Sequence, residues 1–247
     1  MPGKAPTSST LPKSITCTIV PSPKGDPANV LLLLHSVGDT QAGFANLAKS
    51  LSLPETACIS LCAPKNLPFG LQGYQWGEDV VFHGQDLSLD VKFAQAGFKT
   101  LKTTIEKLLS EGWKSREIFF LGWGQGAICV FDYLCREGAE AVGMTSEFGG
   151  FVSIGGIVGS EVKTVVTDDA KKSTTPVLVC GGRNGLVTGK AEERVKSLFK
   201  DVKVVKWDRE GDGMMNDAKE AMPVMQFFSR RLLSRTGIPE GFHELQG

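Results

Sequence analysis

Short aliphatic segments alternate with amphipathic segments along most of the chain, and this alternation restricts the fold more than any other feature. Asn29–His35 and Ala57–Leu61 are continuous apolar runs, as expected for strands that are buried on both faces. Between them, Ala42–Leu53 repeats apolar side chains with helical spacing and ends before Pro54. This order is typical of a mostly parallel sheet covered by helices on both faces. We therefore predict an α/β fold.

The same order continues on both sides of these segments. Ile15–Val20 alternates polar and apolar residues, which predicts an edge strand. The clearest helix is Asp90–Glu111, where apolar residues recur every three or four positions along one face. A last helix ends near Arg235, and we expect it to begin near Pro223 because a proline in the first turn lacks only an N–H that stays unpaired there. The remaining predicted elements are strands at Ile118–Leu121, Phe151–Ile154, Pro176–Cys180 and Val202–Trp207, and helices at Gln125–Arg136 and Lys190–Phe199.

A chain of 247 residues fits one large domain or two small ones. No repeat, low-complexity tract or convincing linker divides it, so we expect a single domain over residues 15–237. Residues 1–14 are rich in Pro, Ser and Thr and are expected to form a flexible leader, without the apolar core of a signal peptide. Residues 238–247 are expected to form a polar C-terminal tail.

Composition excludes several classes of partner. The 27 basic and 27 acidic side chains cancel, whereas nucleic acids and anionic membranes attract a surplus of Lys and Arg. The longest purely aliphatic run, Val30–Leu34, is far too short to cross a bilayer. The six cysteines form no C-x-x-C pair, so buried reduced thiols in a cytoplasmic protein are the better interpretation. We expect no nucleic acid, no transmembrane segment, no metal and no cofactor.

Residues 63–89 form the longest stretch without clear periodicity. A long irregular segment in a compact domain often serves as a lid or a pocket wall. Trp76, Phe82 and His83 are therefore candidates for the lining of a pocket, together with Trp123 farther along the chain. An equal alternative is a surface loop that packs Trp76 and Phe82 on the core.

A glycine-rich turn lies between a predicted strand and a predicted helix, where Gly122–Gly126 reads GWGQG. In α/β-hydrolases the turn at this place is G-x-S-x-G, whose glycines let strand and helix approach closely around a strained nucleophile. The central residue here is Gly124. With Ala127, the turn also satisfies the dinucleotide fingerprint G-x-G-x-x-G/A. That alternative is remote, because the turn lies about halfway along the chain and the strand at Phe151–Ile154 is not followed by an acidic residue for a ribose.

Several other segments carry matching motifs. Leu31–Thr40 reads LLLLHSVGDT, similar to a strand followed by H-G-x-G-D-T, and Gly211–Met214 reads GDGM, similar to a G-x-G-H loop. With Arg116–Ala127, Pro176–Gly182 and Phe227–Leu232, these segments resemble the acyl-protein thioesterase (phospholipase/carboxylesterase-type) family of α/β-hydrolases. The resemblance covers about residues 30–233. It implies an α/β-hydrolase fold, a cytosolic setting and a groove suited to acyl chains or small esters.

Carried over residue by residue, the resemblance leaves no catalytic triad. The serine position is Gly124, the aspartate position falls at Gly185, and the histidine position falls at Met214. None of these side chains can attack, orient an imidazole or carry a proton near neutral pH. The backbone amides of Val37 and Gln125 would still form the family's oxyanion hole.

Two functions follow from this arrangement. The favoured hypothesis is a catalytically silent relative, or pseudoenzyme, that binds a small acyl-type ligand or a protein partner. The alternative is an active carboxylesterase or thioesterase with a displaced nucleophile, for which Ser36, Cys129 and Cys180 are the candidates. The chain holds three histidines; His35 lies in the oxyanion segment, His243 in the polar tail and His83 in the long loop, and of the three we expect only His83 to reach the site.

Overall fold

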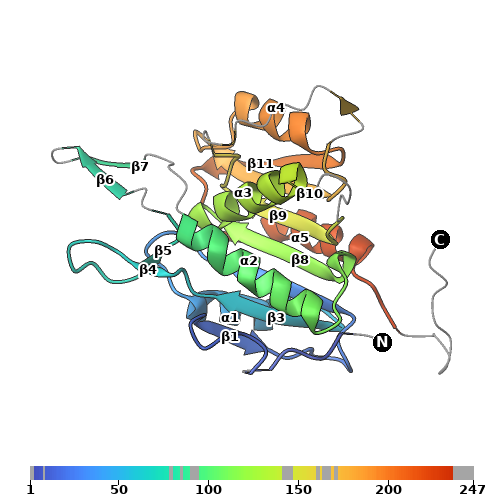
Figure 1. Cartoon of the computed structure of the whole chain (residues 1–247). Helices are drawn as coiled ribbons and strands as arrows, with labels where there is room; N and C mark the ends of the chain where they lie inside the picture. Colours follow the sequence, from blue (N-terminus) through green and yellow to red (C-terminus); the bar gives the residue numbers. More distant parts are fainter. Residues whose placement is uncertain are drawn as a thin grey trace.

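The protein is described from a computed structural model that covers residues 3–7, 9–77, 80–83, 86–89, 95–140, 147–159, 162, 168–169 and 172–235. Within these residues, a seven-stranded sheet forms the centre of the molecule (Figure 1). Its strands, in spatial order, are β1 (Cys17–Val20), β3 (Thr56–Leu61), β2 (Asn29–Leu34), β8 (Ile118–Trp123), β9 (Gly150–Ile154), β10 (Val177–Arg183) and β11 (Val202–Glu210). Only β1 runs antiparallel to its neighbour. The predictions of a mostly parallel sheet and of β1 as an edge strand are confirmed.

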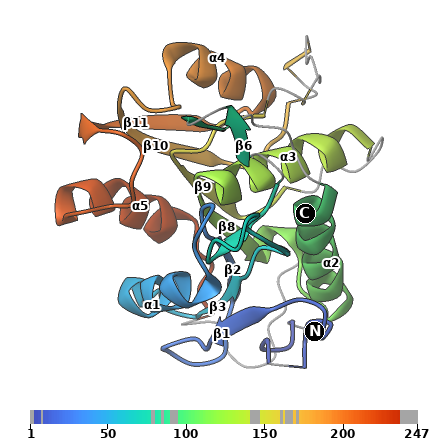
Figure 2. The ribbon, with the colours of Figure 1, turned by 90° about the vertical axis from the view of Figure 1, so that its left-hand side faces the viewer.

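Helices cover both faces of the sheet (Figure 2). They are α1 (Gln41–Leu51), α2 (Gln95–Ser110), α3 (Gln125–Glu140), α4 (Gly189–Leu198) and α5 (Ala218–Arg231), with a short 3-10 turn η1 (Ser115–Glu117) before β8. Side chains of α2, α3 and α4 share one hydrophobic core, and those of α1 and α5 share the other. Leu32 and Leu34 of β2 point into the first core, whereas Leu31 and Leu33 point into the second. A strand buried on both faces therefore needs an unbroken apolar run.

The last helix begins earlier than predicted. α5 starts at Ala218, and Pro223 lies inside it. Asp217 caps the helix, because its side chain accepts a hydrogen bond from the backbone N–H of Glu220 at 2.8 Å. The prediction of a start near Pro223 is therefore wrong: this cap and the burial of Val224 and Phe228 outweigh the one hydrogen bond that an internal proline removes.

Residues 63–89 contain two antiparallel hairpins, which the sequence pattern did not predict. β4 (Lys65–Asn66) pairs with β5 (Tyr74–Gln75), and β6 (Val80–His83) pairs with β7 (Asp86–Leu89). Both hairpins extend beyond the edge at which the parallel strands end (Figure 1). Phe82 and His83 lie on β6, but their side chains are outside the described residues.

Residues near both ends of the described chain contact the domain. Leu11 is buried, and the Trp113 indole N–H donates to the Lys4 carbonyl at 2.9 Å, so part of the leader packs on the domain. Near the other end, the buried side-chain amide of Asn29 donates to the carbonyl of Leu233 and accepts from its N–H, both at 2.9 Å. The predicted tail, residues 238–247, lies outside the described residues.

None of the helices that the structure describes combines the length and the apolar character needed to cross a membrane.

Candidate functional site

The turn at Gly124 joins a strand directly to a helix. β8 ends at Trp123 and α3 begins at Gln125, so Gly124 alone makes the turn, with φ at 50°. Its N–H donates to the Ile154 carbonyl at 2.9 Å, which ties the turn to β9. A left-handed φ suits glycine and strains most other residues. The structure therefore has a tight strand-to-helix turn with a glycine at its centre.

The flanking glycines are required by close packing. A Cβ at Gly126 would lie 2.4 Å from the Leu34 carbonyl oxygen and 2.5 Å from that of His35. A Cβ at Gly122 would lie 2.7 Å from the backbone nitrogen of Ala127. Both glycines thus allow α3 to approach β2 and β8, which explains the glycine pattern without a bound phosphate.

Trp76 connects the two backbone segments that would form the oxyanion hole. Its indole N–H donates to the His35 carbonyl at 2.8 Å, next to the loop that holds Val37. Its backbone N–H donates to Oε1 of Gln125 at 2.6 Å, at the start of α3. Its side chain is 1% exposed, so of its two predicted roles the structure shows core packing. This bracing role was not predicted, because it joins three segments that are distant in sequence.

His35 is engaged by the backbone through both ring nitrogens. Nδ1 lies 2.7 Å from the Ser36 carbonyl oxygen, and Nε2 accepts from the N–H of Ala63 at 3.0 Å. Because Nε2 accepts, the ring is neutral with its proton on Nδ1. Burial lowers the pKa of His35, and the bond to Ser36 only partly opposes this. His35 is therefore a structural residue and has no nitrogen left to act as a general base.

We expect the neutral state of His35 to make folding sensitive to acid. The unfolded chain takes up a proton at His35 near its ordinary pKa, whereas the folded chain resists it, so the free energy of unfolding should fall as the pH drops from about 7.5 to about 5.5. Denaturant unfolding over this range measures the effect. The His35→Gln variant, although less stable, should show a shallower dependence on pH; an unchanged slope would contradict the assignment.

The side chain of Ser36 fills the space next to Gly124. A Cβ built on Gly124 would lie 2.4 Å from Oγ of Ser36 and 3.3 Å from its Cβ. The hydroxyl of Ser36 therefore occupies the place where the side chain of a nucleophile at position 124 would begin. Of the three candidates for a displaced nucleophile, Ser36 is the one that the structure brings to the turn.

The carboxylate of Asp212 fills the space next to Gly185 in the same way. A Cβ built on Gly185 would lie 2.1 to 2.2 Å from the two oxygens and Cγ of Asp212. These oxygens accept hydrogen bonds from the backbone N–H groups of Gly182 and Leu186. Asp212 thus ties the loop after β10 to the loop before α5. The sequence offered no signal for this residue beyond its place in the GDGM motif.

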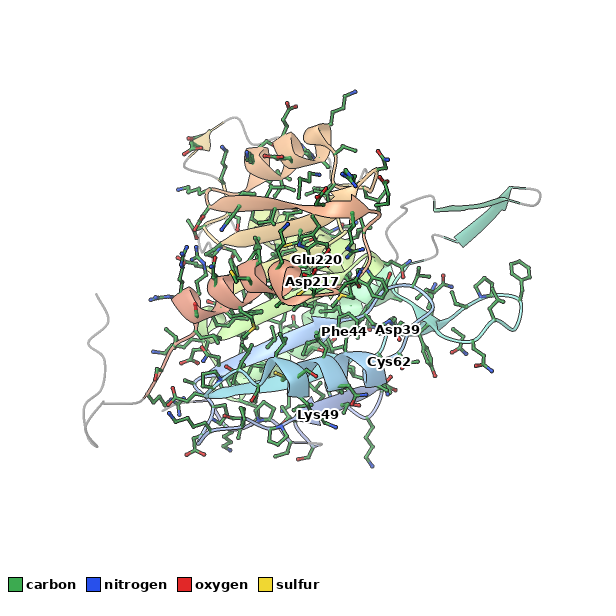
Figure 3. All side chains as sticks on the ribbon, turned by 180° about the vertical axis from the view of Figure 1, so that it is seen from behind. Asp39, Phe44, Lys49, Cys62, Asp217 and Glu220 are labelled. Atoms are coloured by element: carbon green, nitrogen blue, oxygen red, sulfur yellow. The ribbon has the colours of Figure 1, made fainter. Side chains whose placement is uncertain are left out.

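Met214 lies in the loop before α5, and Arg209 of β11 bonds both to this loop and to α5. The Arg209 guanidinium donates to the carbonyls of Gly213 and Met214 at 2.6 and 2.8 Å, and to Glu220 of α5 at 2.7 Å. Glu220 and Asp217 mark this end of α5 in Figure 3. The side chain of Met214 packs on the core that α1 and α5 cover.

Trp123 stands between the turn and this loop. Its indole N–H donates to the Asp212 carbonyl at 2.8 Å, and its ring stacks on that of Phe44 of α1, with the ring centroids 6.5 Å apart. Phe44 is labelled in Figure 3. Trp123 is only partly buried, as a residue on the wall of a groove can be. Trp123, Phe44 and Met214 all adjoin the same core.

The two cysteines considered as nucleophiles are buried. Cys180 is 0% and Cys129 1% exposed, and burial raises the pKa of Cys180 to about 12. A thiol in this state is neither accessible nor ionised near neutral pH. Among the described residues, no group of His, Cys, Asp and Glu side chains has the arrangement of a metal site.

Comparisons with known proteins agree with this architecture. The profile of the phospholipase/carboxylesterase family matches residues 15–208. An uncharacterized hydrolase of Schizosaccharomyces pombe is 31% identical over 231 residues, which cover 91% of each chain. Zea mays acyl-protein thioesterase 2 superposes with a TM-score of 0.65 and 20% identity over 88% of this chain and 99% of that one. A Bacillus cereus carboxylesterase superposes with a TM-score of 0.63 and 15% identity, over 88% and 94%.

Proposed function

The chain belongs to the phospholipase/carboxylesterase family of α/β-hydrolases, and from this premise we propose that it is a catalytically silent member that binds rather than hydrolyses. One observation carries the proposal. The nucleophile and acid positions are glycines, Gly124 and Gly185, and the space beside each is filled by another residue's side chain. Met214 stands at the histidine position, and His35 is fully engaged by the backbone.

We infer that the retained features serve a ligand of the acyl or ester type. The amides of Val37 and Gln125 suit a carbonyl or carboxylate oxygen, and the aromatic and thioether side chains of Phe44, Trp123 and Met214 suit an alkyl chain. A protein partner that contacts the same side chains is the alternative. Free thiols, five of the six buried, favour a reducing compartment such as the cytoplasm.

The purified protein is expected to remain unlabelled by a fluorophosphonate probe and to leave p-nitrophenyl acetate intact, because His35, the one histidine whose side chain the structure describes, has both ring nitrogens bonded to the backbone and cannot take a proton from a hydroxyl. Gel fluorescence and absorbance measure the two results. The Ser36→Ala variant is the matched control and should behave identically. Labelling of the original protein would contradict the proposal.

A second candidate function is hydrolysis with Ser36 as the nucleophile. The position of its Oγ beside Gly124 and one residue before Val37 favours it over the two cysteines. Labelling that is lost in Ser36→Ala would support this candidate.

Binding without turnover is tested with octanoate, which carries both a carboxylate and an alkyl chain. We expect it to change the tryptophan emission of the protein, because Trp123 is partly exposed next to the turn at Gly124. The Trp123→Phe variant should lose most of this change. A titration without any change, or one that persists in the variant, counts against an acyl ligand at this place.

A further inference from the structure

Two side chains outside the triad positions occupy the space that a triad would need. Ser36 comes from the loop after β2 and meets position 124, and Asp212 comes from the loop before α5 and meets position 185. In both pairs the residue at the triad position is a glycine, and the residue that lies beside it carries a polar group, the hydroxyl of Ser36 or the carboxylate of Asp212. The hydroxyl and the carboxylate are therefore still present at the edge of the sheet, but on different loops.

The backbone beneath these side chains keeps the geometry of a hydrolase turn. Gly124 has the left-handed φ of a nucleophile position, and Gly126 keeps α3 in contact with the end of β2. The atoms within 4 Å of an added Cβ at 124 belong to the side chain of Ser36, and the three nearest to one at 185 belong to the side chain of Asp212. The obstruction is thus removable without moving a strand or a helix.

The two obstructions differ in strength. The hydroxyl of Ser36 can rotate away from a new side chain, since no hydrogen bond to the described residues fixes it. The carboxylate of Asp212 accepts from the N–H groups of Gly182 and Leu186, so displacing it leaves two backbone donors without a partner. Asp212 is therefore the stronger block.

We propose that Ser36 and Asp212, beyond the three altered triad positions, are what separates this site from a working esterase. The inference rests on the proposed function and extends it, because it names the residues that keep the site non-hydrolytic. Restoring the triad alone should fail, since the fixed carboxylate of Asp212 would displace the new side chain at 185 and the hydroxyl of Ser36 would crowd the new side chain at 124. Restoring the triad and removing both obstructions should install ester hydrolysis.

The reaction expected of the restored site is ordinary ester cleavage. The introduced hydroxyl adds to the ester carbonyl while its proton passes to the introduced imidazole and from there to the departing alcohol. A water molecule then adds to the acyl group, releases the acid and returns the proton to the hydroxyl. The amides of Val37 and Gln125 would bind the oxyanion in both steps.

The test compares two variants of the full chain. The first is Gly124→Ser/Gly185→Asp/Met214→His, and the second adds Ser36→Gly and Asp212→Ala. We expect fluorophosphonate labelling of the second only, with p-nitrophenyl acetate turnover at least about 10²-fold above the first, the contribution typical of one positioned acid–base group. The five-site variant with Gly124→Ala in place of Gly124→Ser is the matched control and should show neither.

A stability cycle keeps the proposal testable if the five-site variant does not fold. Gly185→Ala should lower the Tm by roughly 5 °C in the original chain, because the new methyl group displaces the Asp212 carboxylate. In an Asp212→Ala background the same change should have almost no further effect. Gly124→Ala should likewise cost less in a Ser36→Gly background, where only the strain of its φ remains.

The outcomes separate this inference from the proposed function. Labelling of the unaltered protein would overturn the proposed function, whatever the variants do. Equal activity of the three-site and five-site variants would show that Ser36 and Asp212 obstruct nothing, and a folded but inactive five-site variant would show that they are not the remaining difference. Additive Tm changes in the cycle would also overturn the inference.

Discussion

Replacing Trp76 with alanine is expected to lower the free energy of unfolding by about 3–5 kcal/mol, among the largest effects of any single truncation in this chain. The side chain is almost fully buried, and its removal leaves a cavity between the β4–β5 hairpin and the core. It also leaves the buried His35 carbonyl without the indole N–H that it accepts. Urea unfolding followed by circular dichroism measures the change.

Two controls separate burial from the hydrogen bond. Trp76→Phe keeps most of the apolar volume but removes the indole N–H, so we expect a loss of about 1–3 kcal/mol. Phe69→Ala lies on the same hairpin, where Phe69 is 80% exposed, and should change stability by less than about 0.5 kcal/mol. A loss below about 1 kcal/mol for Trp76→Ala would contradict the bracing role of this residue.

Gly126→Ala is the second change with a large expected effect. The added methyl group would lie 2.4 and 2.5 Å from the carbonyl oxygens of Leu34 and His35, which belong to the end of β2 and cannot rotate away. Relief requires α3 to move from the sheet, and overpacking of this kind costs about 3 kcal/mol or more. The variant should unfold at a lower denaturant concentration or fail to accumulate as folded protein.

Gly43→Ala provides the matched control for this substitution. Gly43 lies in α1, and its nearest neighbour, a side-chain oxygen of Asp39, would be 3.6 Å from the new Cβ, an ordinary contact. We expect stability to rise by about 0.5 kcal/mol, because alanine loses less conformational entropy than glycine in a helix. A similar loss for both variants would mean that the glycine at 126 is not required for the approach of α3.

Most of the fold follows from local sequence. The unbroken apolar runs of β2 and β3 predict strands that are buried on both faces, and the periodicity of α2 predicts its buried face. The glycines around position 124 predict a tight strand-to-helix turn, and the structure has one. In each case the pattern that predicts the element lies within that element's own residues, so the prediction needs no knowledge of distant contacts.

The rest depends on contacts between distant segments. Asp217 moves the start of α5 because a capping side chain outweighs the proline that follows. The filling of the space beside Gly185 by Asp212, and of that beside Gly124 by Ser36, requires knowing which loops meet at the edge of the sheet. A sequence reveals that a triad side chain is missing, but it does not reveal what stands in its place.

The reciprocal hydrogen bonds between Asn29 and Leu233 have a consequence for synthesis on the ribosome. Asn29 is the first residue of β2, and its fully buried amide bonds early in the chain to the carbonyl of Glu55, but its two bonds with Leu233 are made to a residue 204 positions later. Until Leu233 has left the exit tunnel, the side-chain oxygen of Asn29 lacks its donor and has to stay hydrated, so this end of β2 cannot complete its burial. Nascent chains stalled before that point should therefore stay sensitive to protease around β2, however much of the sheet has already been made.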